Sequence, residues 1–482
     1  MPDSAHQSPI SSWNRREFLA RTGAGFGTLG LAGVLQNAGL LADTTPAAGP
    51  MSPRAGHFPA KARAVIWLFM HGAPSTIDLF DPKPELDRRH GTAMNLGNNV
   101  GFFASTGTVM KSPFRFARHG QSGAWMSEVL PNIARHVDDF AFIRSLHVES
   151  NNHGPALYEM NSGVTRIGFP SAGSWITYGL GSENQNLPGF MVMVDHRAAP
   201  EGGPNSWSSG FLPGAYQGTP VRSTGTSPIL HLNPLPQVGL ERQRRQLDFA
   251  EQLNRQHLER HPAEADLLGR IESFELAYRM QTQAPEAFDL SGETGATQRL
   301  YGLDRPQSRY FGSQMLLARR LVERGVRFVQ VYSGGTTDTE RWDAHTNVKQ
   351  NHEDRAAETD VPIAGLLTDL KHRGLLESTL VIWGGEFGRL PISQGNDLTG
   401  RDHNRLGFGM WLTGAGIKGG TSYGATDELG LRAVENPVTV HDVHATLLHL
   451  LGLDHTRLTY QHNGRQYRLT DVAGNVIDKI LS

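Results

Sequence analysis

The chain has 482 residues, and its 45 lysines and arginines nearly balance its 47 aspartates and glutamates, which gives a formal net charge of −2 at pH 7. This balance disfavours nucleic acid and other partners that are recruited by strong electrostatic attraction. The sequence has no cysteine, which excludes disulfides, thiolate nucleophiles and thiolate-bound zinc or iron–sulfur clusters, but its 21 histidines leave imidazole and carboxylate groups as metal ligands.

Residues 1–42 are predicted to be a twin-arginine signal peptide. Arg15 and Arg16 precede an uncharged segment, residues 22–42, that is rich in Gly, Ala and Leu. A basic start followed by a mildly apolar middle is typical of such signals. The alternative is a transmembrane anchor, which is disfavoured because six glycines make the segment only weakly apolar. We therefore expect a periplasmic or extracellular protein without strong membrane association after signal removal, with residues 43–60 as a linker.

Residues 61–482 are expected to form a single α/β domain. Continuous apolar runs, typical of strands that are buried on both faces of a parallel sheet, alternate with helical patterns. The predicted strands are residues 64–70, 140–143, 189–194, 326–332 and 379–383, and the predicted helices are residues 130–136, 314–324 and 361–373. This alternation predicts a doubly wound, mostly parallel sheet with helices on both faces.

Residues 196–300 are predicted to be an insertion in this domain. Residues 198–232 are rich in Gly, Pro and Ser, which indicates an irregular segment that covers a site. Residues 239–280 are highly charged and carry apolar residues at helical spacing, which predicts one or two amphipathic surface helices. No strict heptad persists there, so a partner-binding coiled coil is disfavoured.

Acidic and imidazole side chains follow several of the predicted strands. Open α/β sheets bind ligands beyond the carboxyl ends of their strands, and divalent ions take imidazole nitrogen and carboxylate oxygen. The candidate metal ligands are His71, Asp78, Asp343, His345, Asp402 and His403. The expected ion is Zn²⁺ or Mn²⁺, with Ca²⁺ or Mg²⁺ as alternatives. Each residue alone has a structural alternative as a helix cap or loop hydrogen bonder, but their recurrence behind successive strands favours a metal site.

Further residues are candidates for catalysis and substrate binding. Arg389 is expected to hold an anion by paired hydrogen bonds; the alternative is a structural arginine that is bonded to loop carbonyls. Glu386 is a candidate for moving protons, or simply a partner of Arg389. His153 is a candidate ligand or general base, and Asn151, among small polar residues that lead into a helix, is a candidate for binding substrate.

Several ordered motifs together resemble domain-of-unknown-function family 1501, over nearly the whole chain behind the signal. They are the twin-arginine start, His71-Gly72 with Asp78, Asn151-Asn152-His153-Gly154-Pro155, Trp342-Asp343-Ala344-His345, Gly384-Gly385-Glu386-Phe387-Gly388-Arg389, Gly400-Arg401-Asp402-His403 and Asp442-Val443-His444-Ala445-Thr446. That family is similar in turn to the alkaline phosphatase-like superfamily, which includes sulfatases and cofactor-independent phosphoglycerate mutases. The resemblance implies an alkaline phosphatase-like fold and a metal-dependent site.

The resemblance implies that Asp343 and His345 stand for an Asp and nearby His of the superfamily, and that His403 stands for its final His. The chain departs from the pattern where the strand-end Asp is His71 and where the Asp-His pair is Glu386-Phe387. These departures favour one metal ion, or a rearranged pair that uses Asp402. Ordinary sulfatase chemistry is disfavoured because no cysteine exists to become formylglycine.

Two functions follow from this resemblance. The first is an exported metal-dependent hydrolase that acts on a phosphate or sulfate ester of a small molecule or glycan. The second is a non-catalytic exported protein of the same fold that binds an anion, a metal or a glycan. The altered Asp-His pair favours the second function. The first is favoured by five retained residues together, namely Asp343, His345, Asp402, His403 and Arg389.

Overall fold

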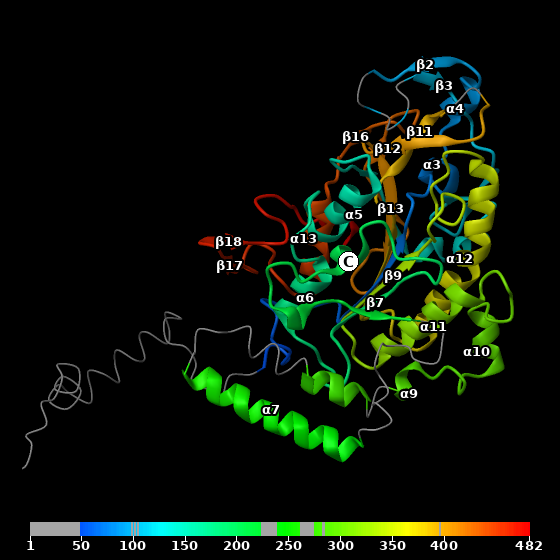
Figure 1. The fold of residues 1–482 in the computed structure, drawn as a ribbon. Coiled ribbons are helices and arrows are strands. Elements are labelled where there is room, and N and C mark those ends of the chain that lie inside the picture. The colour runs from blue at the N-terminus through cyan, green and yellow to red at the C-terminus, as the bar shows by residue number, and fades with distance from the viewer. Residues whose placement is uncertain are drawn as a thin grey trace, which may run out of the picture. The chain divides into compact units, whose positions relative to one another are not determined.

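The computed structural model describes residues 49–97, 100, 103, 106–222, 239–260, 274–281, 285–394 and 397–482 (Figure 1). The described residues within Gly49–Ser482 form one compact unit. The predicted signal peptide, residues 1–42, lies outside the described residues, as do parts of the predicted linker, residues 43–60, and of the predicted insertion, residues 196–300.

An eight-stranded sheet organises this unit, in the order β14-β6-β13-β10-β1-β9-β7-β8. Its strands are β1 (Ala64–Met70), β6 (Phe140–Leu146), β7 (Phe190–Met193), β8 (Thr219–Val221), β9 (Phe328–Ser333), β10 (Thr379–Gly384), β13 (Phe408–Thr413) and β14 (Thr421–Tyr423). Within this sheet β13 runs antiparallel to both of its neighbours, and every other pairing is parallel. The sheet is therefore mostly parallel, as predicted.

Long helices cover both faces of the sheet (Figure 1). They are α5 (His153–Ser162), α6 (Ala172–Leu180) and α13 (Val440–Leu450) on one face, and α11 (Arg309–Glu323) and α12 (Val348–His372) on the other. The central strand β1 shows why: Trp67 and Phe69 pack into the first core, whereas Ile66 and Leu68 pack into the second. The continuous apolar run of β1 predicted a strand that is buried on both faces, and the burial of all of its residues confirms this. The helices on both faces confirm the doubly wound fold that the alternation of strands and helices predicted.

Shorter elements complete the unit. They are α3 (Thr76–Leu79), α4 (Pro84–Arg88), β2 (Ala93–Asn95), β3 (Thr106–Thr108), β4 (Phe116–His119), β5 (Ala124–Ser127), η1 (Ile133–Asp139), η2 (Gly203–Trp207), η3 (Gly214–Tyr216), α9 (Pro285–Phe288), α10 (Gly295–Leu300), β11 (Gly388–Ser393), β12 (Arg401–Asn404), β15 (Ala425–Thr426), β16 (Ala433–Glu435), β17 (Tyr460–His462), β18 (Arg465–Tyr467) and η4 (Asp478–Ile480). The hairpin of β11 and β12 follows β10 and brings residues back toward the end of the sheet.

All three predicted helices have different bounds in the structure. The helix predicted over residues 314–324 is α11, which begins earlier, at Arg309, and ends at Glu323. The segment predicted as a helix over residues 130–136 is the short 3-10 helix η1, whose start is fixed because Asp360 accepts hydrogen bonds from the backbone N–H groups of Asn132 and Ile133. The helix predicted over residues 361–373 begins earlier, at Val348, and contains Pro362 in its interior. The start of η1 thus depends on Asp360, and that of α12 on the side chain of Asn347, which accepts a hydrogen bond from the Gln350 N–H. The pattern of apolar residues alone shows neither contact.

The insertion contains regular structure as well. Helix α7 (Leu240–Arg260) is amphipathic, as predicted, and its Arg244 forms an ion pair with Glu275 at 2.5 Å. Strand β8 was not predicted, because Pro220 interrupts a three-residue run; it lies at the sheet edge, where a proline is tolerated. Among the residues that the structure describes, no helix combines the length and the apolar character that a membrane crossing needs.

Candidate metal centre

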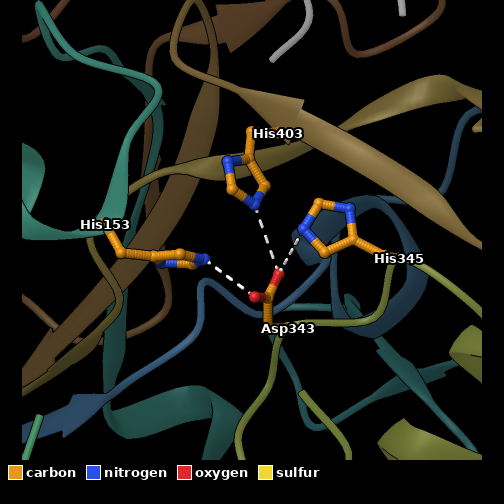
Figure 2. A group of neighbouring side chains, drawn as sticks. All are labelled: His153, Asp343, His345 and His403. Carbon is orange, nitrogen blue, oxygen red and sulfur yellow. Dashed lines mark hydrogen bonds and ion pairs between the residues drawn. The ribbon is translucent and has the colours of Figure 1, made fainter. Parts of the chain in front are cut away.

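Four of the predicted site residues meet at the carboxyl end of the sheet: His153, Asp343, His345 and His403 (Figure 2). His153 is the first residue of α5, Asp343 and His345 lie between β9 and α12, and His403 lies on β12. The Nε2 atoms of His153, His345 and His403 lie 3.0, 2.9 and 3.2 Å from the Asp343 carboxylate oxygens. Three imidazoles from separate parts of the chain thus point at one carboxylate.

Each imidazole also has an oxygen acceptor on its other ring nitrogen, Nδ1. The acceptors are Glu386 Oε1 for His153 (2.5 Å), the carbonyl oxygen of Asn151 for His403 (2.6 Å) and Gln394 Oε1 for His345. Because these oxygens accept hydrogen bonds, each Nδ1 carries a proton and a neutral imidazole keeps its lone pair on Nε2. The lone pairs then face carboxylate oxygens, an arrangement that a shared proton or a metal ion makes favourable.

Two glycines allow these segments to approach so closely. Gly72 has a φ of 100°, and a Cβ atom there would lie 2.6 Å from the backbone nitrogen of Trp342 and 2.7 Å from that of Asp343. A Cβ atom on Gly400 would lie 1.8 Å from the carbonyl oxygen of His345. Any side chain at either position therefore pushes the Asp343–His345 loop out of place.

Arg389 holds Asp343 in place from inside the protein. Its Nη2 lies 2.5 Å from Asp343 Oδ1, and its other donors reach the carbonyl oxygens of Gly72, Ala73 and Arg401. Burial opposes the charge on Asp343, but Arg389 and the three imidazoles outweigh it and hold the pKa of that carboxyl well below its usual range. Since the Arg389 side chain has no exposed surface, these contacts match its structural alternative rather than direct binding of a substrate anion.

Arg341 reaches the same carboxylate from the solvent side, and sequence reasoning missed it. Its Nη2 lies 2.9 Å from Asp343 Oδ2 and 2.9 Å from the carboxylate of Asp338. The Arg341 side chain is 13% exposed, and that of His345 is 12% exposed, whereas Asp343 itself is 2% exposed. The cluster therefore opens to solvent beside Arg341 and His345. The only signal in the sequence was an arginine two residues before Asp343.

A second group, formed by His71, His153 and Glu386, adjoins the first. Glu386 also accepts a hydrogen bond of 2.9 Å from the backbone N–H of Gly72. Burial raises the pKa of Glu386, but its bond with His153 outweighs this and lowers it. Burial opposes the charge on His153, yet its bonds to Asp343 and Glu386 raise its pKa to about 9. At pH 7 the Nε2 atom of His153 therefore shares a proton with Asp343, and a bound metal ion would take the place of that proton. Glu386 has no exposed side-chain surface, so its contact with the site runs through His153.

His71 lies at the edge of this second group. Burial lowers the pKa of His71 to about 4, so its imidazole is neutral at pH 7. Among the described residues, neither His71 Nδ1 nor Glu386 Oε2 has a hydrogen-bond partner, although both atoms are buried. The backbone N–H of Glu201, in the insertion, approaches His71 Nε2 at 3.4 Å. The segment predicted as an insertion thus approaches the site at Glu201.

The structure places the remaining predicted site residues outside the group of four. Asp78 forms a buried ion pair with Arg401, at 2.7 and 3.1 Å, and is not brought to the cluster. Asp402 lies behind it, with Oδ1 4.0 Å from His345 Nδ1 and Oδ2 2.7 Å from the backbone nitrogen of Phe103. Asn151 contributes its carbonyl oxygen, which fixes the orientation of the His403 ring.

Comparisons with known proteins bear on the fold and the family. Among solved structures, the chain is similar to phosphonate monoester hydrolase from Silicibacter pomeroyi, with 12% identity, 73% of this chain and 71% of that chain covered, and a TM-score of 0.35. It is also similar to a sulfatase from Pseudoalteromonas sp., with 13% identity, 81% and 68% coverage and a TM-score of 0.36. A third similar structure is alkaline phosphatase from the Antarctic bacterium TAB5, with 11% identity, 75% of this chain and 94% of that chain covered, and a TM-score of 0.33.

TM-scores this low assign no residue a role, so the roles below rest on contacts within this chain. The comparison with curated proteins finds no match. The family model DUF1501, described as a protein of unknown function, matches residues 62–481. The resemblance drawn from the sequence motifs is therefore confirmed, and the chain belongs to the DUF1501 family.

Proposed function

We propose that this protein is a metal-dependent hydrolase that acts on a phosphate or sulfate ester of a small molecule or glycan. The observation that carries the proposal is the convergence of three imidazole Nε2 atoms on the Asp343 carboxylate, with an oxygen acceptor behind each ring. Metal-binding histidines are oriented in this way, by an acceptor on the ring nitrogen that does not bind the ion. The donor set thus fits a divalent ion without rearrangement of the fold.

The donors fit Zn²⁺ or Mn²⁺ better than Ca²⁺ or Mg²⁺. His153, His345 and His403 offer nitrogen and Asp343 offers oxygen, whereas Ca²⁺ and Mg²⁺ take mainly oxygen ligands. When bound, such an ion supplies positive charge that polarises an ester and makes water more acidic. Four ligand residues for one ion agree with the first of the two arrangements expected from the sequence, a single metal ion, rather than with a pair that uses Asp402.

Three residues around the four ligands would bind the substrate or position the ligands. Arg341, at the solvent side of Asp343, would hold the anionic part of the ester, because its guanidinium is both charged and partly accessible. Glu386 would orient His153 through its 2.5 Å bond to Nδ1 and stabilise positive charge on that ring. Arg389 would keep the Asp343 carboxylate in position from the buried side.

A second function is favoured by one observation, the number of ligands. Structural zinc sites are closed by four protein ligands, whereas catalytic zinc sites keep one position open for water or substrate. If His153, Asp343, His345 and His403 all bind one ion, the site is closed and the protein binds a metal without catalysing hydrolysis. A hydrolase requires instead that the ion keeps a further position for water or substrate, on the partly exposed side of the cluster beside His345.

Elemental analysis and ester assays on the purified protein separate these functions. The substrates are 4-nitrophenyl phosphate and 4-nitrophenyl sulfate, and the variants are His345→Ala and, as a control, His372→Ala, whose residue is exposed at the end of α12. One bound Zn²⁺ or Mn²⁺ per chain, with turnover that only His345→Ala abolishes, supports the hydrolase. Bound metal without turnover supports the closed site, and absence of metal contradicts both.

We also propose that the protein is exported through the twin-arginine pathway. The support is the Arg15-Arg16 pair ahead of the uncharged residues 22–42. Replacing both arginines by lysine should retain the protein in the cytoplasm, as measured by cell fractionation and immunoblotting. Secretion that is unchanged by this double substitution contradicts the proposed route.

A further inference from the structure

An exposed phenylalanine lies at the open side of the candidate metal centre. Phe103 is 63% exposed, although its ring contacts two of the candidate ligands. The centroid of its ring lies 5.0 Å from that of His345, with the two planes at 80°, and 6.4 Å from that of His403. The phenyl ring is therefore roughly perpendicular to the His345 ring and leaves much of its surface to solvent.

The buried Asp402 fixes the backbone of Phe103 at this position. Asp402 Oδ2 accepts a hydrogen bond of 2.7 Å from the Phe103 N–H, and Asp402 Oδ1 accepts one of 2.8 Å from the backbone N–H of His403. One carboxylate thus ties Phe103 to β12, the strand that carries a candidate ligand. This accounts for Asp402, which the sequence suggested as a ligand and which the group of four does not include.

Phe103 and Arg341 each contact one member of the His345–Asp343 pair at the mouth of the cluster. Arg341 contacts Asp343, and Phe103 contacts His345, while His345 Nε2 lies 2.9 Å from Asp343 Oδ1. A ligand that enters beside His345 therefore meets a cation and a largely exposed apolar ring. An ester whose alcohol part carries a ring matches this combination, because the anion pairs with arginine and the ring covers the phenyl face.

We propose that Phe103 determines substrate specificity by stacking against a ring in the alcohol part of the ester. This inference rests on the proposed hydrolase function and names the substrate class of the same site. The ring is either an aryl group or the apolar face of a sugar, since both lose water-exposed apolar surface when they cover a phenyl ring. Short alkyl esters gain little from Phe103 because they have no ring face.

The test compares Phe103→Ala and Phe103→Trp with a matched control, Phe249→Ala, which removes an equally exposed phenylalanine (62%) on α7. The substrates are phenyl, glucose 6- and ethyl phosphate, and the corresponding sulfates. Phe103→Ala should lower the ratio of kcat/KM for the ring ester over the ethyl ester about tenfold, and Phe103→Trp should preserve it. A fall for phenyl esters alone identifies an aryl group, and a fall for glucose esters identifies a sugar.

A binding measurement separates failure of this inference from failure of the proposed function. Calorimetry measures the binding of phenylphosphonate and of inorganic phosphate to the metal-loaded protein. Phe103→Ala should weaken the binding of phenylphosphonate and leave that of inorganic phosphate unchanged. If the wild type hydrolyses no ester, the hydrolase proposal fails, while the phenylphosphonate result still tests Phe103. An unchanged preference for phenylphosphonate in Phe103→Ala, or equal losses for ring and ethyl esters, would overturn the specificity role.

Discussion

Asp343 and Asp78 are both buried aspartates that follow a strand of the same sheet, yet their surroundings differ in one respect. Asp78 is bound by N–H and O–H donors, namely the Arg401 guanidinium at 2.7 and 3.1 Å and the Ser75 hydroxyl at 2.5 Å. Asp343 is surrounded by three imidazole nitrogens in addition to Arg341 and Arg389.

The difference shows which buried carboxylate is equipped to bind an ion. A guanidinium has only donors, so the Asp78–Arg401 pair is satisfied as it stands. Imidazoles whose Nδ1 protons are already engaged offer Nε2 to a proton or a metal ion, so the Asp343 group gains from a cation. Substitutions at the two aspartates should therefore have different consequences, one for metal content and one for stability.

The largest effect is expected for Asp343→Asn. The substitution removes the charge toward which the three imidazoles point, so bound metal should be lost and kcat/KM should fall at least about 100-fold. Elemental analysis and ester assays measure both. The control is Asp338→Asn, which removes a different and exposed partner of Arg341. Full metal content in Asp343→Asn would contradict the inference that Asp343, unlike Asp78, binds a metal ion.

Asp78→Asn should act on stability instead. It leaves the buried Arg401 without its ion partner, which costs about 3–5 kcal/mol of unfolding free energy. Urea unfolding measures the loss, and metal content per folded chain should stay at the wild-type level. The double variant Asp78→Leu/Arg401→Met should recover much of the stability, because it removes both charges together. Selective loss of metal from a stable Asp78→Asn protein would instead make Asp78 part of the centre.

Glu386→Gln should have a smaller effect on the metal. The amide oxygen can still accept the His153 Nδ1–H bond, but the negative charge behind the ring is lost, so metal affinity should fall about tenfold to a hundredfold. Competition with a chromogenic chelator measures the affinity. Gln394→Glu, which places a charge behind His345, should strengthen binding by the same reasoning. Equal affinities in both variants and the wild type would contradict a role for these acceptors.

The smallest effect concerns Glu159 on α5, which accepts two hydrogen bonds, at 2.9 and 3.0 Å, from the Glu149 N–H near the site. Burial raises its pKa from 4.5 to about 7. A carboxyl whose folded pKa is raised contributes stability below its unfolded pKa and loses it as pH rises through 7. When the pH is raised from 5 to 8, the free energy of unfolding of Glu159→Gln should therefore increase relative to that of the wild type by on the order of 1–2 kcal/mol. Urea unfolding in the presence of a chelator measures the free energy of unfolding of both proteins at the two pH values. The same change with pH in the wild type and in Glu159→Gln would contradict the prediction.

The sequence predicted the sheet better than the site. The apolar run of residues 64–70 identifies a buried strand by itself. The edge strand β8 has no such run, because Pro220 lies in the middle of its three residues. Asp78 and Asp343 both read as polar residues after strands, because the partner that distinguishes them, Arg401 for Asp78, lies 323 residues away in the chain. Arg389 is likewise defined by carbonyl groups that only the folded chain brings to it.

X-ray absorption spectroscopy at the metal edge tests the central claim most directly. With Zn²⁺ bound, the account predicts scattering from three imidazole rings and a carboxylate oxygen at about 2.0–2.2 Å, and loss of one imidazole in His403→Ala. An ion coordinated by fewer than two imidazoles, or a spectrum that is unchanged in His403→Ala, would contradict the proposed centre.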